Sequence, residues 1–536
     1  MDIEQFRKAG YQAIDRICDY YYNLQSKPVV SSVEPGYLRE CLPAEPPQKG
    51  ENFDDIADDY QKLIIPGLTH WQHPSFFAYF PTACTFEGMI ADLYASSTAN
   101  PGFNVSGNFM IEDAVFNPSL QWSASPACTE LEAVMMDWAA QLLGLSPEFY
   151  NTSGMGGGAI QVRGYLASDV ESNQTHQPQS TASDSALIAV VAARSLYQRK
   201  HPEAELQELV IYTTSQTHSL GLKAGMVLGL SVRVIDVTWN DHFSLRGDTL
   251  RSALEEDKVN GKKPFILLAT VGTTSSGAID NLPEIGAIAK EHPDLWVHID
   301  SAWAGVALSC PEYREALHLE AINDYAHSFC TNFHKWGLTN FDASTLWVRD
   351  RKYLTEALDV TPPFLRTAHG DAGTVIDYRN WHLGLGRRFR ALKLWFVLRS
   401  FGVQGFQDYI RRTIKLNALF ASLVKSSDQL AIVTPPSLSL TVFHLNPKSV
   451  ATHTESAARD SLNSLNKIFY GRISARNDIL LTSTVLNGIF CIRFAVGSAR
   501  TEESHIHAAY DLLCKEGQAA VDLWEQTTGE QAVQRL

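Results

Sequence analysis

The chain has 536 residues, of which 45% are hydrophobic and 19% are charged, and its formal net charge is −15 at pH 7. This length and composition predict a globular protein of two or three domains with a large core. The acidic balance argues against a nucleic-acid partner. No apolar run reaches bilayer length and the N-terminus carries no secretory signal, so we expect no membrane partner and a cytoplasmic location.

The eight cysteines are scattered along the chain and include no CxxC pair. This spacing indicates reduced thiols, and it gives no sign of a disulfide framework or a zinc site. We therefore expect no metal in the protein.

The first predicted element is a helix within residues 1–30, because apolar residues recur there at helical spacing. These residues are Phe6, Ile14, Ile17, Tyr21 and Leu24. A proline-rich linker follows. The middle of the chain then alternates strands with helices, which predicts βα units and a mostly parallel sheet. We expect strands at 209–213, 232–236, 265–270, 295–300, 326–331 and 344–348, and helices at 186–200 and 250–260.

A long helix is expected at about 387–401, and the pattern changes after it. Strands at 441–445, 479–484 and 490–495, with helices at 454–470 and 502–526, predict a smaller α+β domain. We therefore divide the chain into an N-terminal helical segment at 1–88, a large domain at 89–405 and a small C-terminal domain at 406–536.

A lysine and an aspartate lie at the ends of two successive predicted strands. Lys335 stands in Asn-Phe-His-Lys-Trp at 332–336, and Asp300 ends the strand at 295–300. A lysine amine can form a Schiff base with the aldehyde of pyridoxal 5′-phosphate (PLP), and a carboxylate can keep the pyridine nitrogen of PLP protonated. The pair predicts a PLP enzyme in which Lys335 and Asp300 are catalytic.

Three further features fit the same cofactor. Residues 181–184 open a predicted helix, where hydroxyls and free N–H groups can hold a phosphate. Thr274 follows a strand end and could donate to that phosphate, and His218 could stack on the pyridine ring. Each feature alone has a common structural role, such as helix capping or a hydrogen-bonded turn. Their order and βα context together predict one PLP site.

The stretches 123–132, 295–305, 332–336 and 385–395 resemble the aromatic-L-amino-acid decarboxylases, which are group II PLP-dependent decarboxylases. The resemblance extends from the N-terminal helices to about Trp524. It implies an α/β fold of the PLP-dependent transferase type I, and a homodimer with active sites at the subunit interface. It also implies that the N-terminal helical segment belongs to that interface. It assigns cofactor contacts to Ala182, Ser183, His218, Thr274, Asp300, Ala302, Asn332, His334 and Lys335.

Residues 73–82 are rich in aromatic side chains, and we interpret Phe76 and Phe77 as core. The resemblance implies that this region lines a substrate pocket, and an aromatic pocket favours an aromatic substrate. Glycine at position 386 goes with indolic substrates in plant relatives, which favours tryptophan or 5-hydroxytryptophan. The implied substrate residues are Trp71, Tyr79, Phe80, Thr82, Phe103, His218 and Gly386.

Phe364 leaves the product open. It occupies the position of a mobile-loop tyrosine that assists protonation of the substrate carbon in family decarboxylases, and phenylalanine has no proton to give. In plant relatives this replacement marks aldehyde synthases, which also need the histidine found here as His218. The alternative is a tolerated substitution, with water or His218 as the donor. Decarboxylation is the shared step, with an amine as the default product and an aldehyde as the alternative.

Two other classes compete with these products. One is a non-catalytic dimeric homologue, against which the retained Lys335, Asp300 and His218 argue. The other is a different PLP enzyme such as a transaminase, for which we find no arginine assigned to the substrate carboxylate.

Two segments, 105–121 and 162–179, interrupt the family-like motifs. Each begins with valine, whose codons start with GT, and ends with glutamine, whose codons include CAG. These are the nucleotides found at the two ends of an intron. We interpret the segments as retained introns in a gene prediction. The alternative is a pair of real surface loops, since long insertions cost little closure entropy.

Overall fold

The computed structural model describes residues 1–98, 102–103, 125–161, 181–359, 376, 378–383, 386–447 and 455–534. The chain divides into two compact units. Unit 1 combines Met1–Pro81 with Thr413–Leu536, and unit 2 is Thr82–Arg412. The two ends of the chain therefore belong to one unit, and the middle of the chain forms the other.

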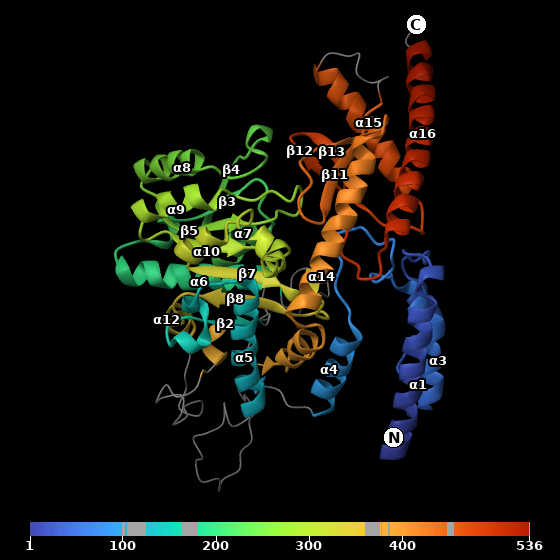
Figure 1. Ribbon diagram of the computed structural model, residues 1–536, viewed down its shortest axis with the longest axis horizontal. Helices are drawn as coiled ribbons and strands as arrows, with labels where there is room; N and C mark the ends of the chain where they lie inside the picture. The colour runs from blue at the N-terminus through green and yellow to red at the C-terminus, as the bar shows by residue number, and fades with distance from the viewer. Residues whose placement is uncertain are drawn as a thin grey trace. The chain divides into compact units, whose positions relative to one another are not determined.

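Unit 2 is built on a seven-stranded sheet in the order β2-β8-β7-β6-β5-β3-β4 (Figure 1). Its strands are β2 (Gly157–Ile160), β3 (Leu209–Thr214), β4 (Ser231–Ile235), β5 (Lys263–Thr270), β6 (Trp296–Asp300), β7 (Ser328–Asn332) and β8 (Ser344–Val348). The strands β3 to β7 pair in parallel, and β8 runs antiparallel to both β7 and β2. The prediction of a mostly parallel sheet in an α/β fold is confirmed.

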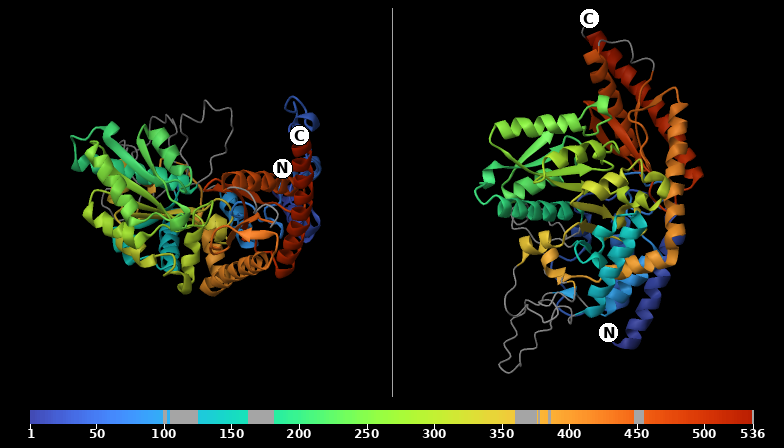
Figure 2. Two further views of the ribbon diagram at one scale, coloured as in Figure 1. Left: turned by 90° about the horizontal axis from the view of Figure 1, so that it is seen from above. Right: turned by 60° about the vertical axis from the view of Figure 1, so that its left-hand side comes forward.

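Two groups of helices cover this sheet. Helix α6 (Ala182–Lys200) contacts α7 (Leu220–Leu228) and α12 (Lys352–Leu358), whereas α9 (Leu282–Glu291) contacts α8 (Gly247–Val259) and α10 (Leu319–Tyr325). Figure 2 shows α6 and α8 on opposite sides of the strands. Because both faces of the sheet are covered, its central strands are buried along their whole length, which explains their continuous apolar sequences. The unit also holds α4 (Phe86–Ser97) and α5 (Pro126–Leu143).

Unit 1 contains a four-stranded antiparallel sheet in the order β10-β11-β13-β12. Rings stack at its core: Phe494 lies 4.1 Å from Phe77 and 3.7 Å from Phe420, measured between ring centroids. Phe76 and Phe77 are fully buried, which confirms that they are core residues. The elements of the unit are α1 (Ile3–Tyr22), α2 (Tyr37–Cys41), α3 (Phe53–Asp59), β10 (Leu430–Ile432), β11 (Leu440–Leu445), α15 (Glu455–Ser474), β12 (Thr482–Leu486), β13 (Ile489–Ala495) and α16 (Glu503–Gln534).

Two predicted boundaries were wrong. The helix expected at 387–401 is α14 (Ala391–Lys425), and the residues before it form β9 (Gly386–Arg387), which pairs with β1 (Gly102–Phe103). The expected end at residue 401 agrees with the structure, because Gly402, with a φ of 62° and a ψ of 179°, makes a kink that separates two helical stretches within α14.

The strand expected at 479–484 is β12, which runs to Leu486. Asn487 and Gly488 both have positive φ, and they form the two-residue turn into β13. An Asn-Gly turn of this kind fixes the register of a hairpin.

None of the helices in the described ranges combines the length and the apolar character needed to cross a bilayer. No disulfide joins any of the eight cysteines. Among the residues that the structure describes, no three His, Cys, Asp or Glu side chains gather as a metal site would require.

Candidate active site

Asp300 and Lys335 lie at the carboxyl ends of two adjacent parallel strands. Asp300 is the last residue of β6 and pairs with Cys330 on β7. Strand β7 ends at Asn332, and the short helix α11 (Phe333–Trp336) carries Lys335 directly after it. In open α/β sheets, ligands bind outside the carboxyl ends of the strands. The structure thus puts the predicted amine and carboxylate at the edge where a cofactor is expected.

His218 joins this pair from a third strand end. Strand β3 ends at Thr214, and hydrogen bonds between Thr214 and Thr217 hold the turn that leads to His218. The pKa of His218 is lowered, first by desolvation of the ring and then by the charges of Lys335 and Lys223, while Asp300 acts in the opposite direction. The imidazole therefore lies within the electrostatic reach of both Asp300 and Lys335, and it is neutral at pH 7.

The segment around Lys335 is held by backbone hydrogen bonds. Ala83 N–H donates to the carbonyl of His334 at 3.0 Å, which brings the neighbouring Thr82 close to α11. Ala343 N–H donates to Nδ1 of the buried His334 ring at 2.9 Å. Burial lowers the pKa of His334 to about 3, so the ring is neutral. Only its Nε2 is left for a cofactor contact.

The predicted phosphate cradle is the N-terminus of α6, where part of the hydrogen-bonding capacity serves a helix cap. The Thr181 hydroxyl accepts from Ser183 N–H, and the Asp184 carboxylate accepts from Thr181 N–H, which makes a capping box. Asn332 points to a missing ligand, because its buried Oδ1 has no hydrogen-bond partner among the described residues. A helix N-terminus, a polar side chain without a partner, an amine and a carboxylate together fit PLP.

Thr274 follows β5 in a turn that requires glycine. Gly272 has a φ of 86°, and a Cβ atom there would lie 2.6 Å from Cβ of Ala304. Thr273 Oγ1 stands 2.8 Å from Ser276 Oγ and closes the turn. This packing leaves Thr274 half-buried at the carboxyl end of the sheet, next to the strand that carries Asp300. Ala302, the next predicted contact, donates its N–H to Asp300 Oδ1 at 3.0 Å.

The predicted substrate residues fall in both units. In unit 1, the exposed rings of Trp71 and Tyr79 stack at 5.4 Å, and Phe80 is buried with the Arg493 guanidinium 5.0 Å from its ring. In unit 2, Phe103 and Gly386 are paired across β1 and β9.

Phe364 and the segments 105–121 and 162–179 lie outside the described residues. Two buried arrangements near the site were not predicted from the sequence. One is the ion pair between Glu132 and Arg387. The other is a set of polar side chains on β6 and β7, including His298 and Cys330. Polar residues two apart within an apolar strand, as in Trp-Val-His-Ile-Asp, were the available signal for the second.

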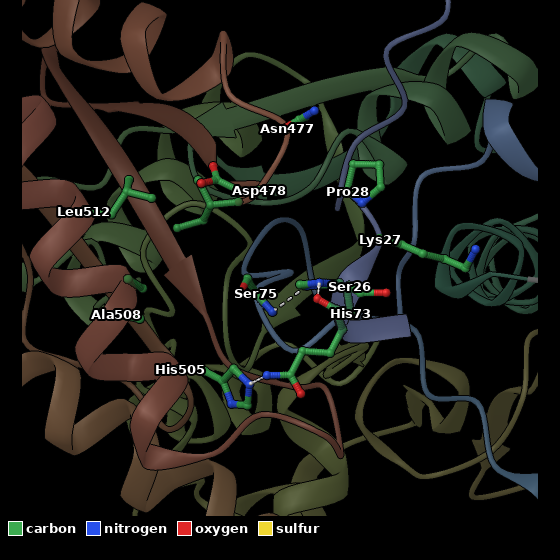
Figure 3. A pocket seen from close by; sticks show the side chains of 13 residues that line it. Ser26, Lys27, Pro28, His73, Ser75, Asn477, Asp478, His505, Ala508 and Leu512 are labelled. Atoms are coloured by element: carbon green, nitrogen blue, oxygen red, sulfur yellow. Dashed lines mark hydrogen bonds between the residues drawn. The ribbon is translucent and has the colours of Figure 1, made fainter. Parts of the chain in front are cut away.

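A separate cavity of about 580 Å³ lies in unit 1 (Figure 3). His505, Ala508 and Leu512 follow one another along α16 at its wall. His73 Nδ1 accepts from Ser75 N–H, and His505 Nδ1 accepts from Glu502 N–H, at 3.0 Å each. The cavity contains none of the predicted cofactor residues.

Comparisons with known proteins agree with this site. Residues 35–446 match the family described as pyridoxal-dependent decarboxylase conserved domain. Tryptophan decarboxylase 2 of Oryza sativa subsp. japonica is 40% identical over 516 residues, which cover 96% of this chain and 94% of that protein. A crystal structure of Oryza sativa TDC with PLP and tryptamine has a TM-score of 0.84 at 34% identity, covering 97% of this chain and 99% of that one.

A crystal structure of Rhodiola rosea 4-hydroxyphenylacetaldehyde synthase has a TM-score of 0.82 at 30% identity, with coverage of 97% and 99%. The matches span nearly the whole chain, and both the fold and the PLP cofactor agree with those inferred from the residues. The chain therefore belongs to the pyridoxal-dependent decarboxylases.

Proposed function

We propose that the protein decarboxylates an aromatic L-amino acid, with tryptophan or a close relative favoured, to the arylalkylamine and CO₂. The observation that carries the proposal is the convergence of Lys335, Asp300 and His218, since the charges of the first two both act on the third. The names of the similar proteins, which include a tryptophan decarboxylase, support an aromatic substrate. So does the stacked aromatic pair of Trp71 and Tyr79.

Each catalytic residue has a role that follows from its chemistry. When bound, PLP supplies an electron sink for the bond that breaks at the substrate Cα. Lys335 provides the amine that holds the cofactor, and the short helix α11, which directly follows β7, keeps it at the sheet edge. Asp300 provides a buried carboxylate for the pyridine nitrogen. Asn332, whose buried Oδ1 has no hydrogen-bond partner among the described residues, and Ser183, in the first turn of α6, are proposed to hold the phosphate.

His218 is the proposed proton-transfer group. Its lowered pKa makes the ring neutral near pH 7, so it can accept a proton at one nitrogen and donate one from the other. Thr82 is proposed to contact the substrate carboxylate, because the N–H of its neighbour Ala83 donates a hydrogen bond to the carbonyl of His334, the residue before Lys335. In this scheme His218 and Thr82 orient the substrate, and Lys335 and Asp300 hold the cofactor.

A second product is favoured by one residue. Phe364 stands where family decarboxylases have a tyrosine, and it has no proton to deliver. If the substrate carbon reacts with O₂ in place of being protonated, the products are an aldehyde, ammonia and peroxide. The similarity to a 4-hydroxyphenylacetaldehyde synthase supports this alternative.

One assay tests both products. The purified enzyme, loaded with PLP, is incubated with tryptophan, 5-hydroxytryptophan, tyrosine, dihydroxyphenylalanine and phenylalanine, and CO₂, amine, ammonia and peroxide are measured. Amine equal to CO₂ with no peroxide supports the decarboxylase. Peroxide and ammonia equal to CO₂ support the aldehyde synthase. Absence of CO₂ from all five substrates would refute the proposed function.

We further propose that the protein is a homodimer, and helix α1 supports this. It has no buried residue, although Phe6, Ile14 and Ile17 lie along one side of it and are 53%, 40% and 38% exposed. A long helix with an exposed apolar stripe is favoured where a partner covers it. A second copy of the chain is the partner that the resemblance to dimeric decarboxylases implies.

A further inference from the structure

A line of polar side chains runs through the core of unit 2 and ends at Asp300. Trp296, His298 and Asp300 alternate along β6, so they share one face of the sheet. On β7, Ser328 is the partner of His298, and Cys330 is the partner of Asp300. All five side chains are buried. Five groups capable of hydrogen bonding therefore lie in sequence on a single face of two central strands.

The distances connect these groups into one chain. Trp296 Nε1 is 2.8 Å from Ser328 Oγ, and that hydroxyl is 2.7 Å from Nδ1 of His298. Nε2 of the same ring is 3.7 Å from Cys330 Sγ, and the sulfur is 3.8 Å from Asp300 Oδ1. The sulfur contacts are longer, as expected for a weak donor and acceptor. An unbroken series of contacts thus leads from the indole to the carboxylate.

The direction of every hydrogen bond in this chain is fixed by chemistry. The indole of Trp296 can only donate, and the thiol of Cys330 donates to Oδ1 of Asp300. Burial lowers the pKa of His298 to about 4, so its ring is neutral and carries one hydrogen. Burial raises the pKa of Cys330 well above its usual range, so the sulfur keeps its proton. With one hydrogen for each contact, every donor must point toward Asp300, and His298 must carry its hydrogen on Nε2.

We propose that Cys330 and His298 are positioning residues, which hold the Asp300 carboxylate in place for the pyridine nitrogen of bound PLP. The Cys330 thiol and the Ala302 N–H both donate to Oδ1, at 3.8 Å and 3.0 Å. Oδ2 accepts no hydrogen bond from the described part of the chain, which leaves it for the cofactor. Because bonds in such a chain polarise one another, His298 strengthens the Cys330 donor. The inference rests on the role proposed for Asp300.

The test uses PLP affinity as its readout, measured by titrating the apoenzyme with PLP and following the visible absorbance of the bound cofactor. In Cys330→Ala the carboxylate loses a donor that favours its charged form. We expect PLP to bind about threefold to tenfold more weakly. The acid limb of PLP affinity should move to higher pH. His298→Phe, which keeps the thiol but removes its polarising partner, should produce a smaller effect in the same direction.

Matched variants separate positioning from packing. Cys330→Ser keeps a donor and should bind PLP within about twofold of the unmodified enzyme. Cys310 is equally buried, and its thiol donates a hydrogen bond to the Gln407 carbonyl at 3.8 Å. Cys310→Ala should therefore leave both the PLP affinity and its pH dependence unchanged. Unchanged affinity in Cys330→Ala would overturn the proposal, as would a loss in Cys330→Ser as large as in Cys330→Ala. Enzyme that binds PLP but releases no CO₂ would refute the proposed function and leave this test valid.

Discussion

Glu132 and Arg387 form an ion pair whose side chains are only 1% and 6% exposed. Glu132 lies on α5 and also accepts the Ile160 N–H at 2.9 Å, while the Arg387 guanidinium lies 4.7 Å from the ring of Tyr378. Arg387 directly follows Gly386, the residue linked to substrate choice by family resemblance. The pair therefore ties the short strand β9 to α5 and to the end of β2.

Removing one partner of this ion pair should strongly lower the free energy of unfolding. Glu132→Gln leaves the Arg387 charge buried without a counter-charge, and breaking a buried pair in this way costs about 3–5 kcal/mol. We expect a large fall in the urea midpoint, followed by circular dichroism. The exposed pair of Arg251 and Glu291 provides the control, because solvent screens it. Glu291→Gln should leave the midpoint where it is, and equal effects of both variants would contradict the argument.

The electrostatic surroundings of His218 predict a shift in the pH profile. The Lys223 charge is one of the causes that lower the pKa of His218, so Lys223→Gln should raise that pKa. If the neutral imidazole is the active form, the acid limb of kcat/KM then moves to higher pH. The measurement is the pH dependence of CO₂ release, with Lys352→Gln, an exposed lysine on α12, as the control.

His218→Asn checks which group produces that limb. The variant should lose the limb altogether, together with its response to Lys223→Gln. A limb that persists in His218→Asn would assign the titration to another group and remove His218 from proton transfer.

Buried histidines predict a loss of stability in acid. Burial lowers the pKa of His298, His327 and His444 to about 4, and that of His334 to about 3. In the unfolded chain these groups titrate near 6.5, so the unfolded state binds protons first as the pH falls. Stability should therefore decline from about pH 6.5 toward pH 4, by up to about 1.4 kcal/mol per pH unit for each histidine.

Urea unfolding at pH 7.5 and 5.0 measures this decline. His444→Asn removes one of the titrating groups from unit 1, so its midpoint should fall less between the two pH values than that of the unmodified protein. A midpoint that rises on acidification would show that carboxylates or surface charge dominate the pH dependence.

The sequence predicted the central strands well because covered parallel strands appear as continuous apolar runs. The placement of Asp300 and Lys335 at one sheet edge could be predicted, because Asp300 ends one such strand, Lys335 closely follows the next, and the carboxyl ends of parallel strands meet at one edge. The ion pair between Glu132 and Arg387 could not be predicted from local sequence patterns, since it depends on packing between elements far apart in the chain. The start of α14 was missed for a related reason, since Gly386 and Arg387 pair with β1, which lies far away in the sequence.

The line of polar side chains from Trp296 to Asp300 could be predicted only in part. The polar residues at every second position of β6 are visible in the sequence, but the register that places Cys330 beside Asp300 comes from strand pairing. A register moved by one residue would turn Cys330 to the other face of the sheet. Local sequence therefore indicates which residues are unusual for a buried strand, and only the fold shows which of them meet.

The exposed stripe of α1 predicts how the dimer can be disrupted. Ile14→Asp places a charge within the stripe, so burying it against a second copy would require removing that charge from water. We expect the variant to be monomeric, or to dimerise at least tenfold more weakly, in analytical ultracentrifugation. Gln12→Asp adds the same charge on the opposite side of the helix and should stay dimeric. If both variants dimerise like the unmodified protein, α1 does not contribute to the interface. If both are monomeric, the charge acts through helix stability, and the assignment of the stripe as the contact surface fails.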